Sequence, residues 1–178
     1  MLNPEITQTR TPTQEINPVF VNRWSPRGMT SEELDEDDLM ALFEAARWAP
    51  SSYNNQPWRF IYAKRNTESW NKLFGLLVEG NKMWAKDSAA LVVLVSRKNF
   101  EYNGKPSVTH QLDAGAAWEE ATRARQELEI PEDYDVMAMI AIGKRGPKEN
   151  LPPPIRDRES PSNRKPLKEI IMEGKYRP

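Results

Sequence analysis

The sequence predicts a single domain of the α+β class. Helical and strand-like segments follow one another without the regular strand-helix-strand rhythm that builds a parallel sheet. Three strand-like segments are present, at residues 59–64, 90–95 and 135–142. The chain has 178 residues, which is enough to bury a core of its own. Three strands are few for a sheet in a domain of this size.

Apolar spacing predicts the first helix. It begins after Asp35, a favourable N-cap residue, and ends before Pro50. Its apolar residues recur at positions i, i+3, i+4 and i+7, and they are Leu39, Leu42, Phe43 and Ala46. The segment is therefore predicted to be an amphipathic helix that leads into residues 49–58.

The remaining elements follow in order. Trp70, Leu73, Phe74 and Leu77 predict a second helix, and Asn81 lies at a break after it. Residues 90–95 are continuously apolar and β-branched, which predicts a strand buried on both faces.

The C-terminal half predicts two more helices with an extended strap between them. Residues 110–128 predict a helix whose first half is small and apolar and whose second half is charged. Residues 144–165 form a strap rich in proline and charge, and residues 167–172 predict a short last helix closed by Gly174. At the other end, residues 1–18 are polar and lack apolar periodicity, so we expect a flexible arm before a domain that spans residues 19–178.

Composition narrows the possible functions. The chain has 25 basic and 26 acidic residues, a balance that argues against a general nucleic-acid or membrane-surface binder. It contains no cysteine and one histidine, His110, which excludes thiolate catalysis and His-rich metal sites. We expect His110 to be structural. If the protein is an enzyme, a cofactor is expected to carry the chemistry.

The N-terminus carries no basic-then-apolar signal pattern. The longest apolar run, residues 89–95, is too short to span a bilayer. We therefore expect a soluble cytoplasmic protein.

Two polar segments are candidate binding sites. Residues 49–58 join the first helix to the first strand, and they carry hydroxyl and amide groups between two prolines with no charge. Such a segment suits a neutral planar ligand, although the same residues are also ordinary turn formers. Arg23 and Arg27 flank Ser25 beside Pro26 and Gly28, a pattern that fits a phosphate grip and equally fits solvated arginines in a turn.

Six ordered segments together resemble the nitroreductase family of flavin mononucleotide (FMN) enzymes. They are residues 22–27, 44–58, 81–87, 113–118, 131–143 and 161–176. The most specific is residues 44–58, with the sequence Glu-Ala-Ala-Arg-Trp-Ala-Pro-Ser-Ser-Tyr-Asn-Asn-Gln-Pro-Trp.

The resemblance implies a cofactor site on matching residues. Those implied to meet the flavin phosphate, ribityl chain and pyrimidine edge are Arg23, Trp24, Ser25 and Arg27. Those implied to reach the flavin from the other subunit are Pro50, Ser51, Ser52 and Asn54, with Gln56 as a weaker candidate. Asn81 is implied to bond the polar edge of the ring, and Arg164 to bond the phosphate.

By the same resemblance the fold is expected to be a nitroreductase-like sandwich of helices around a small mixed or antiparallel sheet. The protein is expected to be an intertwined homodimer with two FMN sites at the interface. It would pass hydride from NAD(P)H to a quinone, a nitroaromatic compound or a similar acceptor by a ping-pong mechanism. No metal is implied, and Trp84 and Trp118 are better explained by packing than by stacking on the cofactor.

The chain departs from the family pattern after Trp118. There it lacks about 20 to 30 residues, corresponding to part of a helix, one strand and their loops. An alternative is therefore a flavin-binding or dimerising member with little or no turnover. A weaker third option keeps the flavin but runs another reaction, such as reductive dehalogenation or dehydrogenation.

Overall fold

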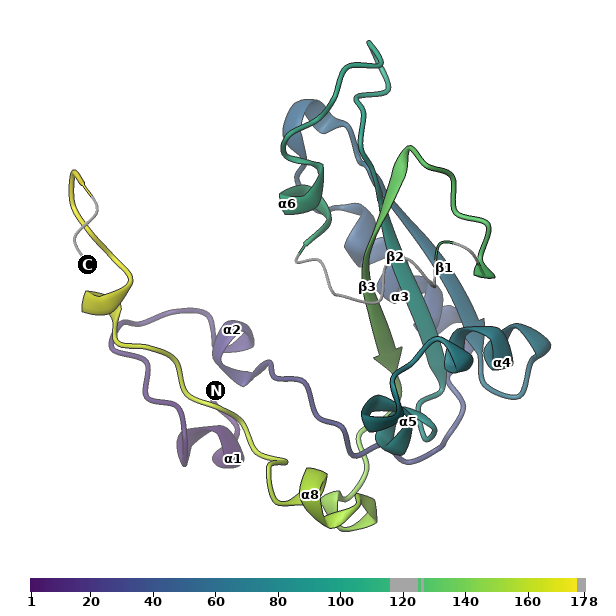
Figure 1. Ribbon diagram of the computed structural model, residues 1–178. Coiled ribbons are helices and arrows are strands. Elements are labelled where there is room, and N and C mark those ends of the chain that lie inside the picture. Colours follow the sequence, from purple (N-terminus) through teal and green to yellow (C-terminus); the bar gives the residue numbers. More distant parts are fainter. Residues whose placement is uncertain (116–124, 126, 176–178) are drawn as a thin grey trace.

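A computed structural model describes residues 1–115, 125 and 127–175 of the chain (Figure 1). Its described strands form one antiparallel sheet in the order β1-β2-β3. The strands are β1 (Trp58–Lys64), β2 (Ala90–Arg97) and β3 (Tyr134–Ile142). The three predicted strands and the α+β class are confirmed, and the sheet is antiparallel throughout.

Strand β2 lies in the centre because it is the most apolar of the three. Its first seven residues are all buried, as the continuous apolar run predicted. Leu91 pairs with Ala63 of β1 and with Ala141 of β3. The pairing of β2 with β3 shifts by one residue between Leu94 and Val95, which is a β-bulge.

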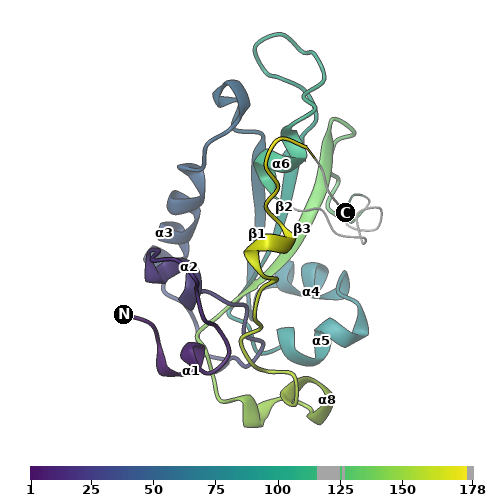
Figure 2. The same cartoon turned by 90° about the vertical axis from the view of Figure 1, so that its left-hand side faces the viewer.

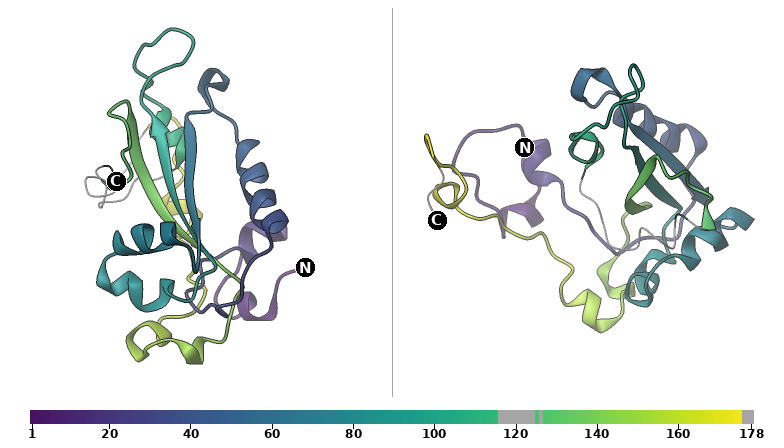
Figure 3. Two further views of the ribbon diagram at one scale, coloured as in Figure 1. Left: turned by 90° about the vertical axis from the view of Figure 1, so that its right-hand side faces the viewer. Right: turned by 45° about the horizontal axis from the view of Figure 1, so that its top comes forward.

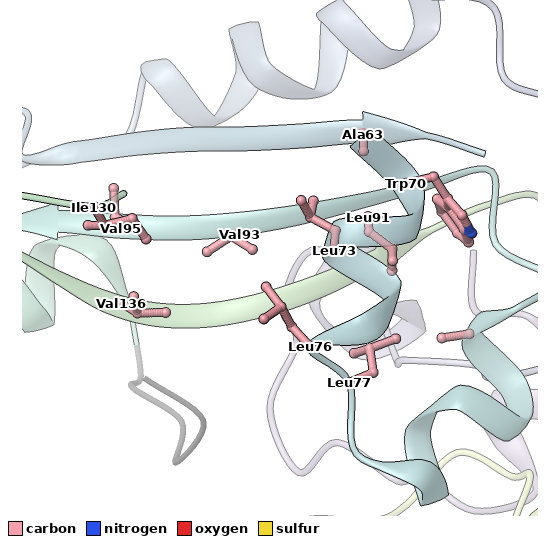
Figure 4. Packing of buried hydrophobic residues seen from close by; sticks show 11 residues of the cluster. Ala63, Trp70, Leu73, Leu76, Leu77, Leu91, Val93, Val95, Ile130 and Val136 are labelled. Atoms are coloured by element: carbon pink, nitrogen blue, oxygen red, sulfur yellow. The ribbon is translucent and has the colours of Figure 1, made fainter. Parts of the chain in front are cut away.

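Two short helices cover one face of the sheet. They are α4 (Glu68–Gly75) and α5 (Glu79–Ala85). Figure 4 shows Leu73 and Leu76 of this layer lying over Leu91 and Val93 of the central strand. Apolar area removed from water stabilises such a core by roughly 25 cal/mol per Å².

The helix α3 (Glu36–Arg47) covers the outer strand on the opposite face. The ring of Phe43 lies 5.4 Å from the rings of both Phe60 and Tyr62 on β1. These two positions alternate along β1 with Ile61 and Ala63, which point to the opposite face and pack in the core beneath α4. The predicted helix is confirmed, but Asp35 occupies the N-cap position without a side-chain capping bond.

The helix predicted over residues 110–128 begins at His110 as expected, but it is interrupted after one turn. Helix α6 (His110–Ala114) ends at Gly115, whose φ of 95° is a left-handed value that glycine adopts without strain. The rest of the prediction, including Trp118, falls largely outside the described residues. His110 begins this helix, is buried, and lies with Nδ1 3.2 Å from the hydroxyl oxygen of Ser96.

Two other predictions need correction. Asn81 lies inside α5 and not at a break between elements. The last predicted helix is a single turn, η3 (Leu167–Glu169), of the 3-10 type.

The two ends of the chain lie beside each other and largely apart from the sheet (Figures 1 and 2). They contain α1 (Pro4–Thr7), α2 (Pro18–Asn22) and α8 (Pro153–Arg156), and η2 (Lys148–Asn150) leads into the last of these. We call residues 1–27 and 151–175 the terminal assembly, and the described residues from 29 to 150 the sheet body. Figure 3 shows the gap between the two regions and the chain segments that join them.

Residues 28–30 and 144–146, where the chain enters and leaves the sheet body, pair with each other through their backbones. The amide of Thr30 donates to the carbonyl of Lys144 at 3.0 Å, and the amide of Gly146 donates to the carbonyl of Gly28 at 2.9 Å. In the described ranges, no helix is both long enough and apolar enough to cross a membrane.

Candidate functional site

Arg10 lies at the centre of the terminal assembly. Its side chain is buried, and the residue is only 7% exposed. Nε donates to the carbonyl of Ser162 at 2.8 Å, while Nη1 donates to the carbonyls of Val21 at 2.5 Å and Arg23 at 2.7 Å. One guanidinium group therefore joins the N-terminal arm, the end of α2 and the C-terminal strap.

The surroundings of Arg10 are strongly positive. Burial lowers the pKa of its guanidinium, and the nearby charges of Arg164 and Arg23 lower that pKa further. All three of its hydrogen bonds within the described chain go to neutral carbonyl oxygens. A buried cation without a paired anion is costly, so this cluster is suited to bind an anionic group.

Arg164 and Arg23 complete this arginine cluster from opposite ends of the sequence. Arg164 is exposed, and its Nη1 donates to the carbonyls of Ser162 at 3.2 Å and Asn163 at 3.1 Å. Nη1 of Arg23 lies 3.3 Å from the hydroxyl oxygen of Ser25. The structure therefore brings together the two arginine sources that the sequence placed at a phosphate site.

A cavity of about 580 Å³ opens between the arm and the strap. Arg10 and Arg164 both line it, and Phe20 and Leu167 contribute apolar surface. Guanidinium groups beside apolar walls fit a ligand with a charged end and an apolar portion.

A buried carboxylate fixes the segment that follows Arg23. Oε1 of Glu159 accepts hydrogen bonds from the backbone amides of Arg27 at 2.6 Å and Gly28 at 2.9 Å. This holds the two ends of the chain together at a second point.

Two predicted site residues of this segment stack with charged or aromatic groups of the sheet body. The guanidinium of Arg145 lies 5.0 Å from the ring centre of Trp24, and that of Arg27 lies 6.0 Å from the ring centre of Trp84. The indole N–H of Trp84 donates to Oδ1 of Asn81 at 3.3 Å. Asn81 is thereby connected to the Arg27 segment through Trp84, which also packs against the core as predicted.

The loop between α3 and β1 contains the other predicted residues, Pro50, Ser51, Ser52, Asn54 and Gln56. It includes the single turn η1 (Ser52–Asn54), and Ser51 Oγ accepts from the amide of Gln56 at 3.0 Å. The side-chain amide of Gln56 donates to Oδ1 of Asn54 at 3.2 Å. The loop therefore carries a dense set of neutral hydrogen-bonding groups.

The backbone of this loop is strained. Tyr53, Asn54 and Gln56 have φ values of 53°, 51° and 46°, in the left-handed region that side chains other than asparagine and aspartate rarely adopt. Strain of this kind collects at binding sites, where the surrounding structure holds it in place.

The end of α3 fixes the entry to the loop. The hydrogen bond from Arg47 and then that from Trp48 lower the pKa of Glu44 to about 2. Oε1 of Glu44 accepts from the indole of Trp48 at 2.9 Å. This carboxylate stays charged at neutral pH and ties the last helical turn together.

The loop and the arginine cluster lie in different parts of one chain. The terminal assembly lies below and to the side of the sheet, whereas the loop after α3 lies near α6 at the far end (Figures 1 and 2). Within a single chain, the structure therefore does not bring the predicted loop residues to the predicted arginines.

Sequence reasoning missed Arg10 and Glu159 because neither lies in a recognisable pattern. One signal was present, since Arg10 is the single basic residue in positions 1–22. No cluster of three or more acidic, histidine or cysteine side chains that could hold a metal occurs among the residues described by the structure.

Comparison with known proteins shows similarity in both sequence and fold. The sequence pattern of the Nitroreductase family matches residues 21–83. A protein of Archaeoglobus fulgidus, named as a candidate NADH dehydrogenase/NAD(P)H nitroreductase, is 28% identical over 150 residues, which cover 73% of this chain and 85% of that protein.

Solved structures agree with this assignment. One described as an oxidoreductase containing FMN is 34% identical, has a TM-score of 0.90, and is matched over 99% of both chains. A nitroreductase from Desulfovibrio desulfuricans is 19% identical with a TM-score of 0.68, over 99% of this chain and 100% of that one, and supports the fold. The chain belongs to the nitroreductase family of oxidoreductases.

The match over 99% of both chains means that this chain and the FMN-containing oxidoreductase have nearly the same length.

Proposed function

We propose that the protein is an FMN-dependent oxidoreductase that passes hydride from NAD(P)H to a quinone, a nitroaromatic compound or a similar acceptor. We also propose that it acts in the cytoplasm as a homodimer with a flavin site at each interface. The observation that carries the proposal is the arginine cluster, where the guanidinium groups of Arg23 and Arg164 lie near the buried guanidinium of Arg10, whose hydrogen bonds within the described residues go to carbonyls.

The donor groups fit FMN in two parts. Arg23 and Arg164 supply the charge-assisted bonds that a phosphate needs, with Ser25 beside them. The neutral hydroxyl and amide groups of the loop, together with Asn81, suit the polar edge of a flavin ring. When bound, FMN supplies the hydride chemistry in ping-pong order, and the chain's own residues bind and orient.

The separation of the loop from the arginine cluster supports a dimer. Since one chain keeps the two sets of groups apart, a single ligand can meet both only if the loop comes from a second copy (Figure 1). The terminal assembly also exposes apolar side chains that a partner would cover, and these are Val19, Phe20, Ile170 and Ile171.

The relatives support the chemistry. The solved structure at 34% identity is described as containing FMN, and the Archaeoglobus relative carries NADH and NAD(P)H in its name. Because the FMN-containing relative is nearly the same length, a chain of this length is compatible with FMN binding. Turnover is what separates the proposal from the alternative of a flavin-binding or dimerising protein with little or no activity.

Purification and reduction test the proposal. We expect a yellow dimer that bleaches when reduced nicotinamide nucleotide is added without oxygen and regains colour when a quinone is added. A yellow protein that does not bleach would support the binding-only alternative, and a colourless protein that cannot be reconstituted would reject both.

A double substitution tests the phosphate site. Charge-assisted hydrogen bonds contribute about 1.5–3 kcal/mol each, so Arg23→Met with Arg164→Met is expected to weaken FMN binding by at least about 100-fold. Arg156→Met with Arg158→Met removes the same charge from exposed positions of the strap and is expected to leave FMN affinity unchanged. Equal FMN affinity in the two double variants, measured by flavin fluorescence, would show that the arginine cluster is not the phosphate site.

A further inference from the structure

We infer that Arg10 is a positioning residue that sets the spacing between Arg23 and Arg164 and so gives the site its preference for a phosphorylated flavin. This inference rests on the proposed function, because it assumes that these two arginines hold the phosphate. It assigns a role to a residue that lies outside every segment on which the family resemblance depends.

The hydrogen bonds of Arg10 reach both sides of the cluster. Its guanidinium bonds the carbonyl of Arg23 itself on one side and the carbonyl of Ser162, two residues before Arg164, on the other. Arg10 and Ser162 are 152 positions apart in the sequence. The guanidinium thus connects the backbone of one phosphate ligand to the backbone beside the other.

Other contacts in the terminal assembly leave this spacing undetermined. Glu159 holds Arg27 and Gly28, which follow the arginine cluster, and Glu5 bonds Arg145 of the sheet body at 2.7 Å. Neither contact includes the backbone of Arg23 or of residues 162–164. Arg10 makes the bonds that join these two backbones.

Because Arg10 is buried, its three hydrogen bonds hold the connection rigidly, and only a guanidinium group can make all three. A planar guanidinium donates in fixed directions, and at 7% exposure it has little water to replace a lost carbonyl. A lysine ammonium keeps the charge but cannot reproduce the three directed bonds from one rigid group. Arg10→Lys therefore separates the effect of geometry from the effect of charge.

The electrostatics of the cluster link Arg10 to the anion. Arg10 lies close enough to Arg23 and Arg164 for their charges to lower its pKa. An anion between the two exposed arginines offsets this repulsion, so phosphate binding is expected to stabilise the arrangement that Arg10 holds. The neutral ring-binding groups on the loop gain nothing from Arg10.

The first experiment compares FMN with riboflavin, which lacks the phosphate. For Arg10→Lys and Arg10→Met we expect FMN affinity to fall at least about tenfold while riboflavin affinity is unchanged, since each charge-assisted bond that is lost corresponds to a factor of this order. Glu5→Gln is the matched control, because it breaks another contact of the arm, and it should keep the FMN-to-riboflavin affinity ratio of the unmodified protein. Retention of that ratio in Arg10→Lys would overturn the inference.

A mutant cycle tests whether Arg10 acts through the two arginines that it positions. If Arg10 only positions Arg23 and Arg164, adding Arg10→Met to the Arg23→Met and Arg164→Met double variant should leave the FMN affinity of that variant unchanged within about twofold. Fully additive losses would overturn the positioning role and make Arg10 an independent phosphate ligand.

Two further measurements keep the outcomes distinct. Thermal unfolding of the apoprotein should show the same main transition in Arg10→Lys and the unmodified protein, so that a changed ratio does not reflect global unfolding. If the Arg23 and Arg164 double variant keeps its phosphate preference, the proposed function fails. If that variant loses the preference and Arg10→Lys retains it, only the present inference fails.

Discussion

The sheet body and the terminal assembly are held together by different forces. In the sheet body, Leu73, Leu91 and Val93 belong to a continuous apolar core around the central strand. In the terminal assembly, buried Arg10 and Glu159 make polar bonds across 152 and 132 positions of sequence. The body therefore depends on packing that tolerates few volume changes, whereas the assembly depends on individual hydrogen bonds that a ligand or partner can reinforce.

The largest expected effect comes from the core of the sheet body. Leu91→Ala deletes a fully buried side chain on the central strand and is expected to lower the free energy of unfolding by about 2–5 kcal/mol. Val108→Ala, at a position that is 95% exposed, should change it by less than about 0.5 kcal/mol. Denaturant unfolding measures both, and similar losses would show that this core does not hold the body together.

A smaller effect is expected at the edge of the sheet body, next to the terminal assembly. A Cβ on Gly146 would lie 2.6 Å from the carbonyl carbon and oxygen of Met29, so Gly146→Ala is expected to cost about 1–3 kcal/mol. Gly80, on α5, has open space around its Cα, and Gly80→Ala should be neutral or stabilise by up to about 1 kcal/mol. The two variants make the same chemical change, and an equal response in thermal unfolding would mean that the backbone crossing at Gly146 is not tightly packed.

The smallest expected effect concerns the ion pair between Glu5 and Arg145. The hydrogen bond from Arg145 lowers the pKa of Glu5 below its ordinary value of 4.5. The stabilisation is therefore present above that value and lost as pH falls through the lowered pKa. Both side chains are well exposed, at 39% and 52%, so the pair is expected to contribute less than about 1 kcal/mol.

Hydrogen exchange at α1 tests this acid step. Protection of the arm should fall between neutral and acidic pH in the unmodified protein, after correction for the intrinsic pH dependence of exchange. Glu5→Gln should show less protection at neutral pH and no corresponding step. A step that persists in Glu5→Gln would assign the acid sensitivity to another carboxylate.

The sequence by itself determined the sheet body. A continuous β-branched apolar run predicts a strand buried on both faces, and the spacing from Leu39 to Ala46 predicts an amphipathic helix, so local patterns sufficed to predict β2 and α3. Of that apolar stripe, the structure buries Leu39, whereas Leu42 is exposed. The order of the polar segments along the chain also resembles the family pattern, and this resemblance predicts the arginines and the loop.

Only the tertiary structure determined which groups surround those residues. Gly115 ends α6 through a left-handed backbone that the apolar pattern does not encode, and Arg10 is buried because two chain ends more than 150 positions apart meet around it. The separation of the loop from the arginine cluster is likewise a property of the folded chain. Such contacts depend on long-range geometry, and local periodicity carries no information about them.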